Sequence, residues 1–298
     1  MSLVAKRFET CADAILFMDN LAYGHDDYVF RGHSKEHYKL TTTLRRHTSI
    51  PHESWSSDVD DLIDSFRTGL AKLNILPFES ENRLDWLEYA RHHGVPTPAL
   101  DFSYSPYVAL FFSFNGVRKS FNAEEKEYVV IYAISPPKLA HRWATISSEY
   151  DHNEWESFLN PVEGLFAKGF PGPHLQFIPA PGKFNYRMHR QQGCLLYDTL
   201  NYDHLSVKDL DDLIASFEEP DLQHGNGEIQ KSLPTGYRIL INSSCVSEVF
   251  SRLELMGINA GSLYMSADGV AEDVKNTYNY NTKTGYLRGV RFPNPSID

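Results

Sequence analysis

The sequence predicts a single α+β domain with a central, mainly antiparallel sheet flanked by helices. Segments with helical periodicity are interspersed with short β-prone runs, as in mixed folds. The chain has 298 residues, without an internal repeat or a convincing linker. We therefore expect one domain over residues 1–298, with two subdomains as the alternative. A loop-rich insert is expected at about 147–185, where proline and glycine are frequent and no period is sustained.

The N-terminal third predicts a helix, a strand and a second helix. The first twenty residues have the spacing of an amphipathic helix, and the glycine of "AYGHDD" ends it. A strand then ends at Gly32, because Tyr28, Val29 and Phe30 form a β-prone run, which places Arg31 at the strand's end. The apolar residues of "SSDVDDLIDSFRTGLAKL" recur at helical spacing behind capping serines.

Two further helices surround the segment "VPTPALDFSYS". The first is "DWLEYARHH", which should stop at Gly94 because glycine is favoured just beyond a helix end. The second is "PYVALFFSF", with Ser105 as N-cap and Pro106 at its first position. It has almost no polar face, so we expect it to be buried.

The remaining elements are strands at residues 128–134, in "CLLYDTL" and in "YRILIN", followed by C-terminal helices. The first of these strands is continuously apolar, which is typical of a strand covered on both faces. "CVSEVFSRLELMG" predicts a helix that ends at Gly257, and "SADGVAEDVKNTY" predicts another.

Composition excludes several classes of protein. The net charge of −11 opposes general attraction to nucleic acid or anionic lipid, although a local basic site can still bind a phosphate. No apolar run approaches the roughly 18 residues of a membrane span, and no signal sequence is apparent, so we expect a cytoplasmic protein. The three cysteines lack metal or disulfide spacing and are expected to be reduced.

Metal binding is not expected. "HTSIPH" and "DHNEWE" contain suitable residue types, but their spacing matches no helical HExxH motif and no metal-binding loop. We therefore predict no metal ligands.

Three motifs in a fixed order carry a resemblance to a known family. "YVFRG", then "HHGVPTPALDFSYSPYVALFF", then "RQQG" ahead of a strand resemble the FRG-domain family over roughly residues 28–270. The resemblance implies a bacterial, intracellular protein but little biochemistry. The chain departs from the family's "PTRLLDWT", with Pro98 in place of the arginine and Phe102-Ser103 in place of Trp-Thr.

The same motifs more distantly resemble arginine-type ADP-ribosyltransferases, and this resemblance implies NAD as a substrate. It makes Arg31 the phosphate ligand, and Ser103 and Ser105 the hydroxyls of the nicotinamide-ribose pocket. A guanidinium presents a fixed fork of donors to phosphate oxygens, and Gly32 beside it would let a ligand approach the backbone. We expect His93 and Asp101 to complete this nucleotide-binding cleft.

The third motif leaves the question of catalysis open. It offers Gln191 and Gln192 where the comparison enzymes have glutamate, and an amide cannot supply the negative charge that stabilises a cationic transition state. We expect Gln192 in the pocket, with catalysis depending on it or on another carboxylate such as Glu248. The alternative is a non-catalytic sensor domain that binds a small ligand, nucleic acid or protein, and the oligomeric state is not predictable.

Each site residue also has a structural explanation. Arg31 could form an ion pair with the Asp101 carboxylate, and Asp101 could hydrogen-bond amides of the turn that follows it. Ser105 could act as a helix cap only. His93 could stabilise the C-terminus of its helix.

Overall fold

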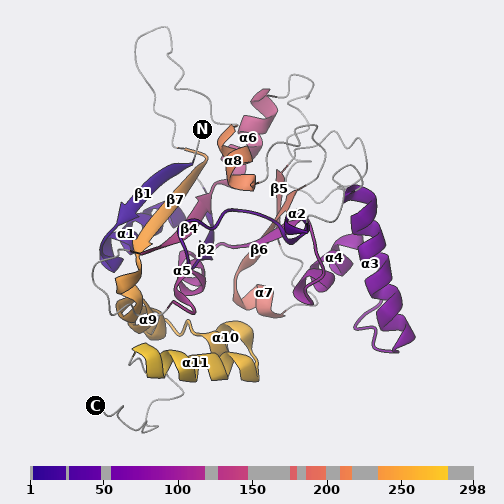
Figure 1. Ribbon diagram of the computed structural model, residues 1–298. Coiled ribbons are helices and arrows are strands. Elements are labelled where there is room, and N and C mark those ends of the chain that lie inside the picture. The colour runs from indigo at the N-terminus through magenta and orange to yellow at the C-terminus, as the bar shows by residue number, and fades with distance from the viewer. Residues whose placement is uncertain are drawn as a thin grey trace.

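The fold is that of a computed structural model, which describes most of the chain between residues 3 and 280 (Figure 1). The described residues are 3–24, 27–47, 55–117, 127–146, 175–179, 186–198, 209–216 and 234–280.

The N-terminal part alternates strands and helices. Its elements are β1 (Val4–Phe8), α1 (Cys11–Ala22), β2 (Val29–His33), α2 (Thr43–Arg46), α3 (Trp55–Lys72), α4 (Arg83–His92), β3 (Ala99–Ser103), α5 (Pro106–Phe114), β4 (Tyr128–Ile134) and α6 (Pro136–Ile146). The C-terminal part ends in helices. Its elements are β5 (Leu175–Pro179), α7 (Tyr186–Arg190), β6 (Gly193–Asp198), α8 (Leu210–Ser216), β7 (Gly236–Asn242), α9 (Val246–Leu255), α10 (Ala260–Tyr264) and α11 (Ala267–Tyr280).

The strands form one seven-stranded sheet in the order β1-β7-β4-β2-β3-β6-β5. The β1–β7 pair is parallel and the other five pairs are antiparallel. The predicted α+β fold with a mainly antiparallel central sheet is therefore confirmed.

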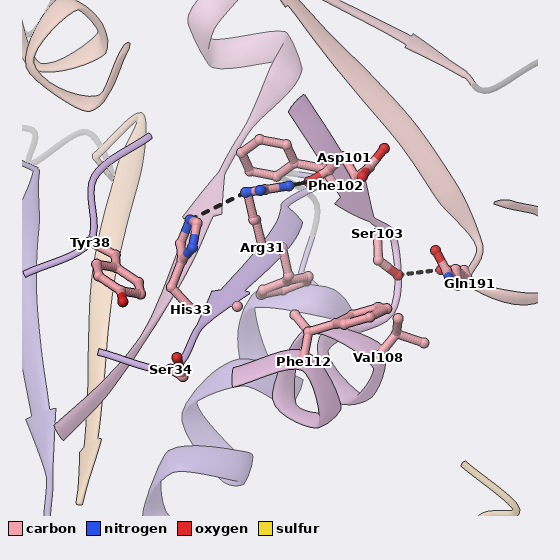
Figure 2. Close-up of a pocket in the computed structure, with 13 residues that line it drawn as sticks. Arg31, His33, Ser34, Tyr38, Asp101, Phe102, Ser103, Val108, Phe112 and Gln191 are labelled. Carbon is pink, nitrogen blue, oxygen red and sulfur yellow. Dashed lines mark hydrogen bonds between the residues drawn. The ribbon is translucent and has the colours of Figure 1, made fainter. Parts of the chain in front are cut away.

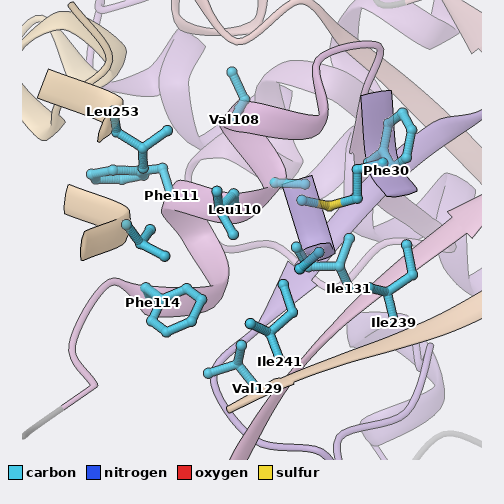
Figure 3. Close-up of a cluster of buried hydrophobic side chains, with 14 of the residues drawn as sticks. Phe30, Val108, Leu110, Phe111, Phe114, Val129, Ile131, Ile239, Ile241 and Leu253 are labelled. Carbon is cyan, nitrogen blue, oxygen red and sulfur yellow. The ribbon is translucent and has the colours of Figure 1, made fainter. Parts of the chain in front are cut away.

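Hydrophobic clusters cover both faces of the sheet. The cluster on the first face contains buried residues of α1, α5 and α9, several of which Figure 3 shows packed against Ile131, Ile239 and Ile241. The cluster on the opposite face includes Leu139 of α6 and buried residues of α8. A third cluster joins α3 and α4 to β3, β5 and β6.

The interior strand β4 explains the continuous apolar run in the sequence. All seven of its residues are buried. Its odd-numbered residues from 129 to 133 belong to the first cluster, and its even-numbered residues from 128 to 134 belong to the second. Successive side chains of a strand point to opposite faces, so a strand between two cores has no solvent-facing side.

Several predicted helix boundaries are confirmed. Ser105 caps α5 by accepting a hydrogen bond from the Val108 amide, and Pro106 occupies the first helical turn. Gly94 and Gly257 follow α4 and α9 with φ of +83° and +71°, a conformation that side chains with a Cβ rarely adopt.

The N-terminal helix is wrong in its extent. Residues 4–8 form the edge strand β1, and α1 starts only at Cys11, with Thr10 as its N-cap. Four of the five β1 residues are exposed, so hydrogen bonding to β7, and not a hydrophobic pattern, makes this segment a strand. Sequence periodicity carries no signal for such a strand.

Two other boundaries need correction. Strand β2 continues to His33, so Arg31 lies in its middle and not at its end. Asp101 lies inside β3, whereas the sequence predicted it at the start of a turn. Within the predicted loop-rich insert, residues 175–179 form β5, whereas residues 147–174 and 180–185 lie outside the described residues.

The cysteines Cys11, Cys194 and Cys245 are free and buried, as expected for small hydrophobic side chains. Burial raises the pKa of both Cys11 and Cys194 to about 12, so neither is a reactive thiolate at neutral pH. Among the helices of the described segments, none has the length and apolar character needed to cross a membrane.

Candidate functional site

The candidate site lies where the central sheet opens between β2 and β3. These two strands pair at one position, Phe30 with Ser103, whereas β2 pairs with β4 and β3 pairs with β6 over five residues each. Continued antiparallel pairing would place Arg31 opposite Phe102 and Gly32 opposite Asp101. The strands separate instead, and a pocket of about 290 Å³ opens there.

The pocket wall combines polar groups from the strands with apolar groups from α5. Its lining residues are Phe30, Arg31, Gly32, His33, Ser34, Tyr38, Asp101, Phe102, Ser103, Val108, Ala109, Phe112 and Gln191. Polar and apolar residues contribute about equally to this wall, and small-molecule sites combine apolar surface with polar groups that orient the ligand.

Arg31 bridges the opening in the sheet with its side chain. Its Nη1 donates to the main-chain oxygen of Asp101 at 2.6 Å, and its Nε donates to His33 Nε2 at 3.2 Å (Figure 2). The β3 carbonyl thus bonds to a side chain in place of a strand neighbour. His33 accepts at Nε2, so its ring is neutral with the proton on Nδ1.

The charge of Arg31 has no carboxylate partner within 4 Å among the described residues. The predicted ion pair between Arg31 and the Asp101 carboxylate is therefore wrong, because that carboxylate pairs with Arg91. Burial, and then the charge of Arg46, lowers the pKa of Arg31 to about 10, so Arg31 stays cationic at neutral pH.

The same positive charges keep His33 neutral. Burial is the largest cause, followed by the charges of Arg31 and Arg46, and together they lower the pKa of His33 to about 3. The positive potential in this pocket contrasts with the acidic balance of the whole chain.

Gly32 is required by the packing of α5. A Cβ at this position would lie 2.0 Å from the main-chain oxygen of Ala109 and 2.7 Å from the amide nitrogen of Ser113. The helix backbone therefore approaches β2 more closely than any other residue would allow. Because α5 carries Val108 and Phe112 of the pocket wall, Gly32 positions that wall.

The two serines differ in position. Ser103 lines the pocket, donates to the main-chain oxygen of Gln191 at 2.6 Å and accepts from the Ser105 amide at 2.9 Å. Figure 2 shows the Ser103 bond to Gln191 at the edge of the pocket. Ser105 does not line the pocket, and its hydroxyl caps α5.

A second pocket of about 240 Å³ adjoins the first. Its lining residues are Glu88, Arg91, His92, Asp101, Phe112, Arg187, Met188, Gln191, Leu195 and Tyr264. Asp101, Phe112 and Gln191 line both pockets, so the two form adjoining parts of one cleft.

Two guanidinium groups face this second pocket. Arg91 pairs with the Asp101 carboxylate, and its buried Nε has no hydrogen-bond partner. Arg187 donates from Nε to the Tyr264 main-chain oxygen at 3.2 Å, and its guanidinium lies 4.9 Å from the centre of the Tyr264 ring. These contacts leave the terminal nitrogens of Arg187 available to a ligand.

Besides Ser105, three other residues expected at the site line neither pocket. His93 follows α4 and packs against Tyr89, with ring centres 4.5 Å apart. Gln192 is exposed with φ of +47°, and its neighbour Gln191 lies in the wall instead. Glu248 pairs with Arg252 on the surface of α9.

Sequence reasoning missed His33, Arg91 and Arg187. His33 lies two residues after Arg31, and this period places both side chains on one face once β2 is known to continue. Arg91 lies two residues before His93 in the same motif, but the sequence pattern gave no reason to choose it. Arg187 reaches the cleft only through the packing of α7 beside α10.

Metal binding has no candidate in the part of the chain that the structure describes. No three histidine, cysteine, aspartate or glutamate side chains converge there. Residues 48–52 and 151–156, which contain most of the two motifs considered above, lie outside the described residues.

Comparison with known proteins supports the first resemblance. The model of the FRG domain matches residues 26–122 of this chain. That segment includes β2, β3 and α5, and thus most of the wall of the Arg31 pocket. Searches of curated proteins and of solved structures found no significant match.

Proposed function

We propose that the cleft between β2 and β3 binds a nucleotide of the NAD type, with Arg31 as a phosphate ligand. The observation that carries this proposal is a cationic side chain, Arg31, that faces a pocket and whose contacts within the described residues are with neutral acceptors. Arg31 has five N–H donors, of which two are used by His33 and Asp101. The three that remain suit a phosphate, since guanidinium donors match its oxygens.

The rest of the pocket suits the other parts of a nucleotide. Tyr38, Phe102 and Phe112 offer aromatic surface against which a base or a nicotinamide ring can stack. Ser34 and Ser103 also line the pocket, and the Ser103 hydroxyl, whose proton goes to Gln191, can still accept a hydrogen bond from a ribose hydroxyl. Because the net charge of the chain is −11, anion binding at this pocket would depend on local arginines and not on a generally basic surface.

In the enzymatic version of this proposal the protein transfers or hydrolyses ADP-ribose. In hydrolysis the bond from ribose C1′ to nicotinamide breaks, water adds to C1′, and one proton is released. A carboxylate near C1′ stabilises the cationic transition state. Asp101 lines the pocket and is the candidate for this role, because Gln191 carries no charge and Glu248 lies elsewhere.

The second candidate function is a non-catalytic sensor that binds the nucleotide without turnover. The ion pair between Asp101 and Arg91 favours it, because a carboxylate held by a guanidinium is less able to stabilise another cation.

The test is binding and turnover of NAD by the purified protein. We expect NAD and ADP-ribose to raise the thermal unfolding temperature, and Arg31→Lys to weaken binding at least about tenfold, because lysine lacks the fork of donors. Arg252→Lys is the matched control, since Arg252 lies in an exposed pair on α9.

Release of nicotinamide distinguishes the enzyme from the sensor. Turnover that Asp101→Asn abolishes supports the enzyme, and binding without nicotinamide release supports the sensor. Unchanged affinity in Arg31→Lys, or no binding of NAD and ADP-ribose by the wild type, would refute the proposed function.

A further inference from the structure

The two pockets of the cleft meet at one residue that contacts an arginine on each side. The main-chain oxygen of Asp101 accepts from Arg31 in the first pocket, and its carboxylate pairs with Arg91 in the second. Two guanidinium groups from β2 and α4 therefore flank a single position in the wall that the pockets share.

We propose that this position receives a diphosphate, with one phosphate bound by Arg31 and the next bound by Arg91 in place of the Asp101 carboxylate. The inference rests on the proposed function and narrows it. It adds a second anion subsite and assigns the ligand to the diphosphate class, which includes nucleoside diphosphates and dinucleotides but not monophosphates.

The condition of Arg91 supports this second subsite. Its side chain is 15% exposed, so it is largely desolvated, and its only ion pair is with Asp101 within the described residues. Its Nε is buried without a hydrogen-bond partner, which leaves a donor that a phosphate oxygen can satisfy. Burial, and then the charge of Arg31, lowers its pKa to about 10, so an added anion would relieve repulsion between the two cations.

The balance of charge around the cleft also favours an anion. Among the described residues, the charged side chains that line the two pockets are Arg31, Arg91, Arg187, Asp101 and Glu88, and the charge of Arg46 acts on Arg31 from nearby. Positive charges therefore outnumber carboxylates among these residues. Burial, and then the charge of Arg187, lowers the pKa of His92, so this histidine adds no charge at neutral pH. A diphosphate, which brings at least two negative charges, offsets that excess.

Asp101 is suited to the role of a displaceable partner. Its side chain is 46% exposed, so it can turn into solvent when a phosphate takes its place. Its main chain is held independently, because β3 pairs with β6 from Ala99 to Ser103. The contact from the Asp101 main-chain oxygen to Arg31 therefore survives the displacement.

The experiment compares ADP with AMP by isothermal titration calorimetry. We expect the wild type to bind ADP about tenfold or more tightly than AMP, because each charge-assisted contact contributes at least this factor. Arg91→Gln should reduce ADP affinity to the level of AMP while leaving AMP affinity within about twofold. Asp101→Asn, which keeps the shape but removes the competing charge, should strengthen ADP binding several-fold.

A matched control removes the same charge elsewhere. Asp64→Asn lies on the exposed face of α3 and lines neither pocket, so it should leave both affinities unchanged. Should Arg91→Gln fail to fold, the isosteric Asp101→Asn still tests the inference.

The outcomes separate this inference from the proposed function. Equal affinity for ADP and AMP, equal losses of both in Arg91→Gln, or weaker ADP binding in Asp101→Asn would each overturn the diphosphate subsite while leaving a nucleotide site intact. Failure of the wild type to bind AMP, ADP or NAD would overturn both proposals.

Discussion

Gly32→Ala should destabilise the protein strongly, although it adds a single methyl group. The new Cβ would lie 2.0 Å from the Ala109 oxygen, 2.7 Å from the Ser113 nitrogen and 2.9 Å from the Ser113 Cβ. Ordinary contacts begin at about 3.4 Å, so α5 and β2 must separate by more than 1 Å. Two of the three atoms belong to the helix backbone, so no rotamer change relieves the overlap.

The magnitude follows from the position of α5 in the core. Overpacking a core typically costs about 1–3 kcal/mol, and here it also displaces a helix whose Phe111 and Phe114 are fully buried. We expect a loss of about 3 kcal/mol or more of unfolding free energy, at the upper end of that range. The same displacement moves Val108 and Phe112 of the pocket wall, so ligand binding should weaken as well.

Gly69→Ala is the matched control. Gly69 is an exposed residue inside α3, and a Cβ there would meet no atom within 4 Å. Alanine is a better helix former than glycine by about 1 kcal/mol, so this variant should be neutral or more stable. Urea unfolding followed by circular dichroism measures both variants. A Gly32→Ala protein within about 0.5 kcal/mol of wild type would refute the close approach of α5 to β2.

Three other predictions concern His33, a buried ion pair and a helix cap. The pKa of His33 is lowered in the folded protein, so on acidification the unfolded chain binds a proton at His33 first, and stability is lost as pH falls from about 6.5 toward 3. We expect the free energy of unfolding, measured with urea, to fall by about 2 kcal/mol between pH 7.5 and 5. A His33→Asn variant that kept the full pH dependence would contradict this assignment to His33. Arg45 and Asp198 form an ion pair at 2.5 Å with side chains 3% and 0% exposed, so Arg45→Met should lower the free energy of unfolding by about 3 kcal/mol or more. The control Arg67→Met breaks an exposed pair and should lower it by less than about 1 kcal/mol. Similar losses for the two variants in chemical denaturation would argue against burial of the Arg45–Asp198 pair. Ser105→Ala removes the N-cap of α5 and should cost about 1 kcal/mol, and thermal melts without a change would show that the cap contributes nothing.

Local patterns were enough to predict most of the longer helices and the buried strands β2, β4, β6 and β7, but not the buried strand β3. The helix α5 is an example, because a capping serine, a proline and an apolar run identify its start and its burial within nine residues. The strand β1 was not predictable in the same way. Its side chains are mostly exposed, and the reason it is a strand is the backbone pairing with β7, more than 200 residues later in the chain.

The candidate site likewise has residues that were predictable from the sequence and residues that were not. Arg31 and Ser103 were predicted from sequence and line the pocket. Gly32 was predicted there because it would let a ligand approach the backbone, whereas the structure shows that it lets α5 approach β2. His93, Gln192 and Ser105 were also predicted, but they line neither pocket, because each lies just beyond the end of a helix or strand, where the local turn directs the side chain. The pairing of Asp101 with Arg91 joins residues that sequence reasoning had no basis to combine.

By itself, the sequence determined the mixed fold class, the order of most elements and the placement of an arginine next to a glycine on a strand. These features depend on propensity, periodicity and capping, which act over a few residues. Only the tertiary structure decided that the sheet opens between β2 and β3, since strand separation depends on pairing partners distant in the chain. It also decided that Arg31 faces neutral acceptors in that opening while Asp101 turns to Arg91, because the environment of a charge is set by the neighbours that packing assembles.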